Sequence, residues 1–327
     1  MTHEPLAGEA SLFHEQERQN AVALIELALK EDLGDAGDIT ANATIPPQAR
    51  GAARFVARSE GVLAGLPVIA LLASHFEIAW GWQPCLSDGD RLGPGSDIAR
   101  IEGPMRALLA MERTALNFLQ RLSGIATLTA RFVAAVTGTK AVILDTRKTT
   151  PGWRALEKYA VRCGGGSNHR AGLYDGVLIK DNHLAWLAAN QEAPGDAEFR
   201  ASFGQGAHNP LRGSDAISQA LLSARFRTPK GTAIELEVDT LMQFDRAIEC
   251  GPDIILLDNF SPELLAEAVR RRDARAPHIL LEASGGVTLA TARALAQTGV
   301  DRISVGALTH SAPALDIGLD FDKVLPA

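Results

Sequence analysis

The chain has 327 residues, of which 46% are hydrophobic and 22% charged, and its formal net charge is −7. This length suits about two domains, or one barrel with an added lobe, and the composition supplies a sizeable buried core. The negative charge argues against general binding to nucleic acids or anionic membranes, because both require a positive field.

The cysteines and the first residues bear on the cellular compartment. Cys85, Cys163 and Cys250 are widely spaced and suggest neither a metal site nor a disulfide framework. Residues 1–20 are polar, and no run approaches the roughly 20 apolar residues of a membrane span. We therefore expect a cytoplasmic protein without membrane or nucleic-acid partners.

The first third of the chain predicts a tail and a small sheet-based domain. Residues 1–20 are expected to be a polar tail, and a helix is predicted from about Ala21 to Glu31, ending at Gly34. Short apolar runs broken by glycine then indicate strands, with one helix near residues 67–75. The predicted N-terminal domain covers residues 21–120.

A long helical stretch, residues 105–136, leads into the second domain, predicted for residues 121–327. We expect this helix to break near Gly124. Beyond it, six short apolar runs alternate with helical stretches: residues 141–145, 176–179, 234–238, 253–257, 278–281 and 302–305. This alternation predicts parallel βαβ units and favours a closed or nearly closed α/β barrel over an open sheet. Residues 191–213 show no periodicity and are expected to form a surface insertion.

Polar, charged or glycine residues follow each of the six runs. They are Asp145–Thr150, Lys180–His183, Glu237 with Asp239, Asp258 with Asn259, Glu282–Gly286, and Gly306. Any one of them could be an ordinary turn residue. In an α/β barrel, however, the active site is built at the carboxyl ends of the strands, and the recurrence favours such a site.

A local excess of positive charge indicates an anionic ligand. From Thr146 to Lys180 the sequence contains seven Lys or Arg residues and only two acidic residues. Those at strand ends or in the glycine-rich loop are predicted to contact the ligand: Arg147, Lys148, Arg170 and Lys180, with His169 as a further positive group. The others are expected to face solvent from a helix: Arg154, Lys158 and Arg162.

Two further patterns suggest phosphate and metal binding. Ser284, Gly285 and Gly286 precede a predicted helix start, where backbone N–H groups can cradle a phosphate, and Gly306 would complete that pocket. Glu237 and Asp258 would face the same rim from different strands. They either pair with nearby basic residues or hold a Mg²⁺ that carries a pyrophosphate, and spacing alone leaves both interpretations open.

A series of motifs occurs in a characteristic order along nearly the whole chain after the tail. They are EDLGDAGDIT (31–40), ERTALNFLQRLSGIAT (112–127), DTRKTTPG (145–152), GGGSNHR (164–170), IKDNH (179–183), ELEVD (235–239), LDNF (257–260) and EASGG (282–286). In these motifs the chain resembles the quinolinate phosphoribosyltransferase family.

The resemblance implies a fold, a reaction and an assembly. The implied fold is that of the type II phosphoribosyltransferases, an N-terminal α/β sandwich followed by an incomplete, open α/β barrel. The implied reaction transfers phosphoribosyl from phosphoribosyl pyrophosphate to quinolinate with decarboxylation, giving nicotinate mononucleotide, pyrophosphate and CO2 for NAD biosynthesis. Family members form homodimers with shared active sites, and Arg113 matches the arginine that reaches into the partner's site.

The resemblance also assigns site residues. The carboxylates of quinolinate fall to Arg147, His169, Arg170 and Lys180, and Thr146 belongs to the same substrate site. Lys148 matches a lysine near the pyrophosphate, while Glu237 and Asp258 match the acids near the ribose and its Mg²⁺, which favours their functional interpretation. Together these three form the implied catalytic set. The 5′-phosphate pocket comprises Ser284, Gly285, Gly286 and Gly306. Trp153 departs from the family pattern, where a smaller aliphatic residue is expected, and is not expected to touch the site.

Two other functions are compatible with parts of this sequence. A Schiff-base lyase would use Lys180 as its barrel lysine but would leave the arginines and the Ser284–Gly286 motif without a role. A non-catalytic relative, such as the paralogues associated with molybdenum transport, would lack the KDNH motif that is present at 180–183.

Overall fold

The computed structural model describes residues 12–78, 81–190 and 215–322. Contacts group the described residues into two units that each comprise several chain segments. The first unit draws on Met1–Val133, Lys148–Asn168 and Gly306–Ala327, and the second on Ala134–Arg147 and His169–Val305. The boundaries expected at residues 20 and 120 stay predictions.

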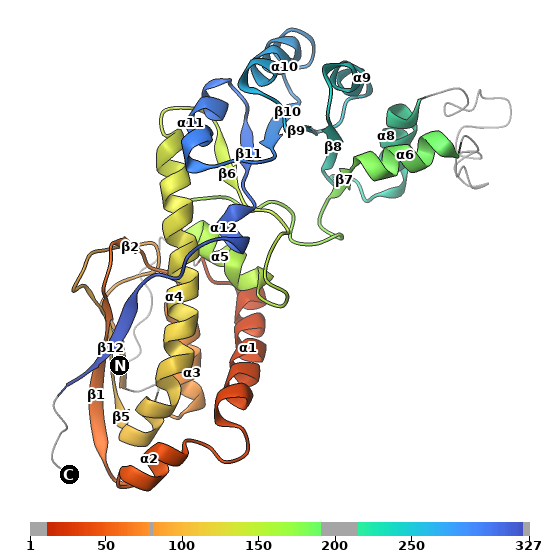
Figure 1. Ribbon diagram of the computed structural model, residues 1–327. Helices are drawn as coiled ribbons and strands as arrows, with labels where there is room; N and C mark the ends of the chain where they lie inside the picture. The colour runs from red at the N-terminus through yellow and green to blue at the C-terminus, as the bar shows by residue number, and fades with distance from the viewer. Residues whose placement is uncertain (1–11, 79–80, 191–214, 323–327) are drawn as a thin grey trace. The chain divides into compact units, whose positions relative to one another are not determined.

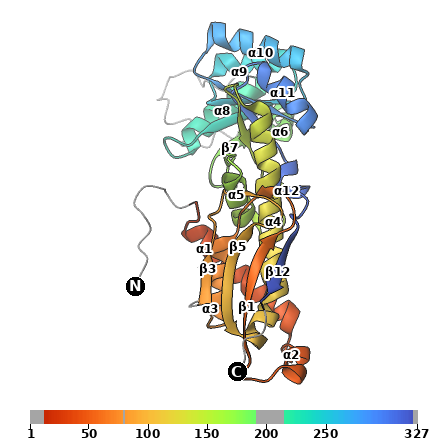
Figure 2. The ribbon, with the colours of Figure 1, turned by 90° about the vertical axis from the view of Figure 1, so that its left-hand side faces the viewer.

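An antiparallel sheet organises the first unit. Its strand order is β12-β1-β5-β3, with β1 at Arg50–Ala57, β3 at Trp82–Pro84, β5 at Asp97–Pro104 and β12 at Ile317–Phe321; Figure 2 shows these strands side by side. Ala53 and Phe55 alternate with less buried residues along β1 and are fully buried, so one face of the sheet supplies core. A separate short pair joins β2 (Gly61–Val62) to β4 (Arg91–Leu92).

The first helix is longer than expected. α1 spans Glu15–Leu33 and ends at Gly34, as predicted, but it begins within the expected tail. Its first turn is stabilised because His14 N–H donates to Glu17 Oε2 at 3.0 Å and Glu17 also pairs with Arg162 at 2.7 Å. The partner of Glu17 lies far along the chain, which is why the polar composition of this turn gave no helix signal.

The remaining helices of the first unit are short, except for α4. They are α2 (Ile39–Thr44), α3 (Leu66–His75), α5 (Arg154–Cys163) and α12 (Ala307–His310). α4 runs unbroken over Met105–Val136, so the predicted break near Gly124 is wrong. A Cβ on Gly124 would lie 2.1 Å from the Pro313 carbonyl oxygen, so this glycine allows close backbone packing.

The second unit contains a six-stranded parallel sheet in the order β6-β11-β10-β9-β8-β7. The strands are β6 (Val142–Leu144), β7 (Val177–Ile179), β8 (Ile234–Val238), β9 (Ile254–Asp258), β10 (Leu280–Ser284) and β11 (Arg302–Ser304). Each matches one predicted run. Among the described residues no pairing joins β6 to β7, so the sheet is an open, incomplete barrel and not a closed one.

Helices connect these strands and lie along their outer side in Figure 1. They are α6 (Asp181–Ala189), α8 (Ala216–Arg227), α9 (Leu241–Cys250), α10 (Pro262–Arg275) and α11 (Leu289–Gln297). Side-chain caps start several of them: Thr240, Ser261 and Thr288 each accept a hydrogen bond from a backbone N–H of the first turn. Because the strands are parallel, their carboxyl ends all reach one edge of the sheet.

Two further expectations concern the insertion and membrane-spanning segments. The insertion predicted for residues 191–213 lies outside the described residues. None of the helices that the structure describes is long and apolar enough to span a membrane.

Candidate active site

Two arginines approach each other at the carboxyl edge of the six-stranded sheet. Arg147 follows β6, and Arg170 lies in the loop before β7. Burial, and after it the positive charge of Arg147, lower the pKa of Arg170 below its usual range. Arg170 Nη1 donates to the Gly176 carbonyl at 2.9 Å, which holds the guanidinium against its own loop. Two cations placed this closely favour a ligand with more than one negative charge.

Lys180 and Glu237 form an ion pair at the same edge. Lys180 directly follows β7, Glu237 lies on the neighbouring β8, and the register pairs Ile179 with Leu236. The side chain of Glu237 is 12% exposed, whereas that of Lys180 is 43% exposed. The predicted alternative in which Glu237 pairs with a basic residue is therefore present in this structure.

Asp258, at the end of β9, is linked to the glycines after β10 by Asn259. Asn259 Nδ2 donates to Asp258 Oδ2 at 2.7 Å, and Asn259 N–H donates to the Ser284 carbonyl at 2.9 Å. Gly285 has φ +92°, and a Cβ there would lie 2.1 Å from Asn259 Oδ1. Only glycine fits this position. Asn259 itself has φ +56°. It is one of the polar residues expected at a strand end, but it is not among the predicted site residues.

Lys148 and Gly306 meet within the first unit. A Cβ on Gly306 would lie 3.2 Å from Lys148 Cδ and 3.1 Å from His310 Nε2. Thr309 Oγ1 also donates to the Lys148 carbonyl at 2.7 Å. The predicted lysine and phosphate-pocket glycine are thus neighbours, and His310 joins them. Sequence reasoning missed His310 because no charge pattern marks it, although it lies four positions after Gly306 on α12.

His169 is placed differently from the cationic ligand predicted. Its Nε2 lies 3.0 Å from Glu235 Oε2 and 3.4 Å from Glu282 Oε1, and both carboxylates are buried. The ring Nδ1 accepts the backbone N–H of Arg170 at 2.8 Å. The backbone N–H of His169 donates to Asp145 Oδ1 at 2.9 Å. Glu235 and Glu282 were not among the predicted site residues, because a lone Glu in an apolar strand gives no local signal of its partner.

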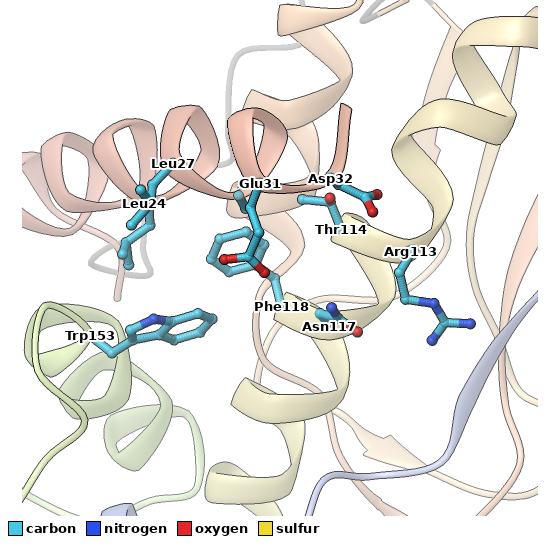
Figure 3. Close-up of a pocket in the computed structure, with 10 residues that line it drawn as sticks. Leu24, Leu27, Glu31, Asp32, Arg113, Thr114, Asn117, Phe118 and Trp153 are labelled. Atoms are coloured by element: carbon cyan, nitrogen blue, oxygen red, sulfur yellow. The ribbon is translucent and has the colours of Figure 1, made fainter. Parts of the chain in front are cut away.

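Arg113 lines a groove of the first unit. The groove is lined by Leu24, Leu27, Ala28, Glu31, Asp32, Arg113, Thr114, Asn117, Phe118 and Trp153. Figure 3 shows Glu31 reaching from α1 towards the space beside α4, while the Arg113 guanidinium points away from Trp153. Trp153 stacks on Phe118 with ring centroids 4.9 Å apart. The residue that departs from the family pattern therefore lines the same groove as Arg113. The expectation that Trp153 touches no predicted site residue stays a prediction.

The basic residues of α5 do not all face solvent as expected. Lys158 is 4% exposed, and Arg162 bonds to Glu17 and Asn168. Glu157 is fully buried on the same helix, accepting from Arg121 Nη2 at 2.7 Å and from Thr150 N–H at 3.1 Å. Arg162 and Glu157 are held by partners from distant segments of the chain, which a helical period cannot reveal.

The chemistry of Glu237 and Asp258 fits a magnesium ion. Both are carboxylates at the ends of adjacent parallel strands, and Mg²⁺ is bound through one or two carboxylates together with substrate phosphates.

Thr146, the last of the predicted residues, is half-buried between Asp145 and Arg147. The paired arginines, the glycine turn and the carboxylates all lie at the catalytic edge of an α/β barrel, which defines the class of a barrel enzyme for multiply charged anionic substrates.

Comparisons with known proteins identify the family within this class. The model of the quinolinate phosphoribosyl transferase N-terminal domain matches residues 38–123, and that of the C-terminal domain matches residues 125–205 and 205–320. The chain belongs to the quinolinate phosphoribosyltransferase family.

Its relatives cover nearly the whole chain. The nicotinate-nucleotide pyrophosphorylase [carboxylating] of Mycobacterium leprae is 44% identical over 90% of this chain and 95% of its own length. A probable enzyme of the same name from Bacillus subtilis is 40% identical over 89% of each chain. The solved structure of NadC from Streptococcus pyogenes matches with a TM-score of 0.80, 35% identity and coverage of 94% of this chain and 98% of its own.

Proposed function

We propose that this protein joins quinolinate to phosphoribosyl pyrophosphate and releases pyrophosphate and CO2, giving nicotinate mononucleotide. The observation that carries the proposal is the pair Arg147 and Arg170, two half-buried cations at the carboxyl edge of the barrel. Quinolinate carries two carboxylates on neighbouring ring carbons, and a bidentate set of guanidinium groups recognises such an anion. The relatives' names describe the same reaction.

Arg147, Arg170 and Lys180 hold the two carboxylates and set the ring nitrogen against C1 of the ribose. The nitrogen lone pair forms the new bond to C1 as the bond from C1 to the pyrophosphate oxygen breaks. Because pyridine nitrogen is a weak nucleophile, C1 becomes cationic early, and Glu237 and Asp258 stabilise that charge. Fixing both reactants in this way can supply roughly 7–11 kcal/mol in favourable cases.

Lys148 neutralises the charge that builds on the leaving pyrophosphate, and Ser284, Gly285, Gly286 and Gly306 receive the 5′-phosphate through their backbone N–H groups. Glu237 and Asp258 would hold a Mg²⁺, which supplies further neutralisation of the pyrophosphate when it is bound. Once the ring nitrogen is alkylated, its positive charge stabilises the electron pair left at the adjacent carbon as CO2 departs. A solvent proton then completes that carbon.

We further propose a cytoplasmic homodimer in which Arg113 serves the partner's site. Two observations support this: Arg113 is exposed, and the groove beside it contains none of the other predicted substrate residues among the residues that the structure describes. An Arg113→Ala subunit mixed with a Lys180→Ala subunit should then regain partial activity, since one of the two sites per dimer keeps both side chains. Verified heterodimers without any recovery would contradict shared sites.

The direct test of the reaction measures quinolinate-dependent release of CO2 and pyrophosphate by the purified protein with Mg²⁺. Omitting quinolinate is the control. Trapping with borohydride and a carbonyl substrate tests the lyase alternative, which the ion pair between Lys180 and Glu237 disfavours because Schiff-base formation requires a neutral amine. No release of either product would refute the proposed function and favour a non-catalytic relative.

A further inference from the structure

Three ionisable side chains meet inside the second unit, below the edge where substrates bind. His169, Glu235 and Glu282 each offer one ligand atom, and these atoms lie within 4.8 Å of one another. Glu235 is on β8 and Glu282 on β10, with β9 between them (Figure 1). Alternate residues of a strand point to the same face, so Glu235 lies on the face of β8 that carries Glu237, one step deeper.

The hydrogen bonds around the His169 ring determine its tautomer. Nδ1 lies 2.8 Å from the Arg170 N–H and can only accept there, so it carries no proton. Nε2 faces the Glu235 carboxylate at 3.0 Å and must donate to it. The ring is therefore the neutral Nε2–H form. Both nitrogens are engaged within the protein, which leaves the ring poorly placed to serve as a cation for a substrate carboxylate.

The two carboxylates have unequal roles in this cluster. Glu282 is fully buried, and its oxygens have no hydrogen-bond partner among the described residues. Burial, and after it the negative charge of Glu235, raise the pKa of Glu282 to about 7. Glu235, at the shorter distance from Nε2, is the charged acceptor, and its negative charge also acts on Arg170.

The loop that carries Arg170 is thus anchored to three strands through one residue. His169 N–H binds the fully buried Asp145 after β6, and the ring binds Glu235 on β8 and faces Glu282 on β10. Beyond this anchor the chain continues directly into Arg170, whose backbone N–H is held by the same ring. A shift of the ring would move the backbone from which the Arg170 guanidinium extends.

We propose that Glu235 is a positioning residue for quinolinate binding, which acts by accepting the His169 Nε2–H and so holding the ring in the tautomer that fixes the Arg170 backbone. His169 is then a positioning residue as well. The inference rests on the proposed function, because it assigns Arg170 to a quinolinate carboxylate. This role requires that Nδ1 accepts the Arg170 N–H and that a protein group accepts the Nε2–H. It does not require a positive charge on the ring.

Variants of His169 separate this role from direct binding. His169→Asn keeps an oxygen that can accept the Arg170 N–H but loses the contact with Glu235, so it should raise the KM for quinolinate by about threefold, less than His169→Leu. His169→Leu removes both contacts and should raise that KM about tenfold, equivalent to about 1.4 kcal/mol, while Glu235→Leu removes only the Glu235 contact and should match His169→Asn. The KM for phosphoribosyl pyrophosphate should change less than about twofold in all three. His278→Asn, at an exposed histidine, is the control.

Ring-nitrogen NMR shifts of histidine-labelled wild-type protein supply a second measurement that does not depend on activity. We expect the neutral Nε2–H form of His169 near neutral pH, retained in Glu282→Gln. An imidazolium or an Nδ1–H ring would overturn the proposal, as would a His169→Asn variant as impaired as His169→Leu. If wild-type protein releases neither CO2 nor pyrophosphate, the proposed function fails, while the NMR result still decides whether the anchor exists.

Discussion

The glycine pair after β10 offers a sharp test, because a side chain would meet neighbouring atoms at only one of the two positions. Gly285 and Gly286 both have positive φ, +92° and +57°, so alanine at either pays a backbone cost of about 1–2 kcal/mol. A Cβ on Gly286 meets no heavy atom within 4 Å among the described residues, whereas one on Gly285 would lie 2.1 Å from Asn259 Oδ1 and 2.9 Å from Asn259 N. Overpacking adds about 1–3 kcal/mol at Gly285 alone.

Gly286→Ala should therefore lower the free energy of unfolding by about 1–2 kcal/mol, and Gly285→Ala by about 2–5 kcal/mol. The Asn259 side chain must move in Gly285→Ala, and with it the hydrogen bond to Asp258 Oδ2. We expect the KM for phosphoribosyl pyrophosphate to rise more in Gly285→Ala than in Gly286→Ala.

Denaturant unfolding and initial rates at varied phosphoribosyl pyrophosphate measure both effects. Quinolinate is held saturating so that only the second substrate is read. Equal losses of stability, together with equal KM values in the two variants, would refute the reasoning, since the contact with Asn259 is the sole difference argued between them.

Arg170→Ala should raise the KM for quinolinate far more than that for phosphoribosyl pyrophosphate, and Arg170→Lys should recover little because it cannot form a bidentate pair; equal effects on both substrates would contradict the assignment. Asp258→Asn should lower kcat and raise the Mg²⁺ concentration for half-maximal rate, so an unchanged Mg²⁺ dependence counts against a metal-side role. Burial opposes ionisation of Asp301, but hydrogen bonds from Lys140, the Leu281 N–H and Arg272 outweigh it and lower its pKa. Because the pKa of Asp301 is lower in the folded than in the unfolded state, its ionised carboxylate stabilises the fold at pH values above the unfolded pKa of about 3.9. This stabilisation is lost as the pH falls through the folded-state pKa. Asp301→Asn should thus cost about 3 kcal/mol near neutral pH and progressively less below about pH 4, measured by denaturant unfolding; a cost independent of pH would refute this.

Local periodicity determined the strands of the second unit and their common edge. Apolar runs such as residues 234–238 and 302–305 became strands β8 and β11, because buried parallel strands need continuous apolar sequence. The polar residues after them fall at one edge as a consequence of parallel pairing. The family motifs then pointed to a reaction and assigned roles to side chains that spacing alone left open, such as Glu237 and Asp258.

Contacts between segments far apart in the sequence determine other parts of the fold. β12 pairs with β1 across most of the chain, and Gly124 lies inside α4, where its missing side chain leaves room for the Pro313 backbone. Neither partner is visible from the local sequence. The same holds for α1, whose first turn depends on Arg162.

Residue type and local pattern are enough to establish which chemical groups this protein carries and that these groups follow parallel strands. The orientation of His169, with Nε2 towards Glu235 and Glu282 and Nδ1 towards Arg170, depends on the folded chain. Hydrogen-bond partners and burial are properties of groups brought together from distant segments. A charge on a histidine therefore cannot be assigned before its neighbours are known.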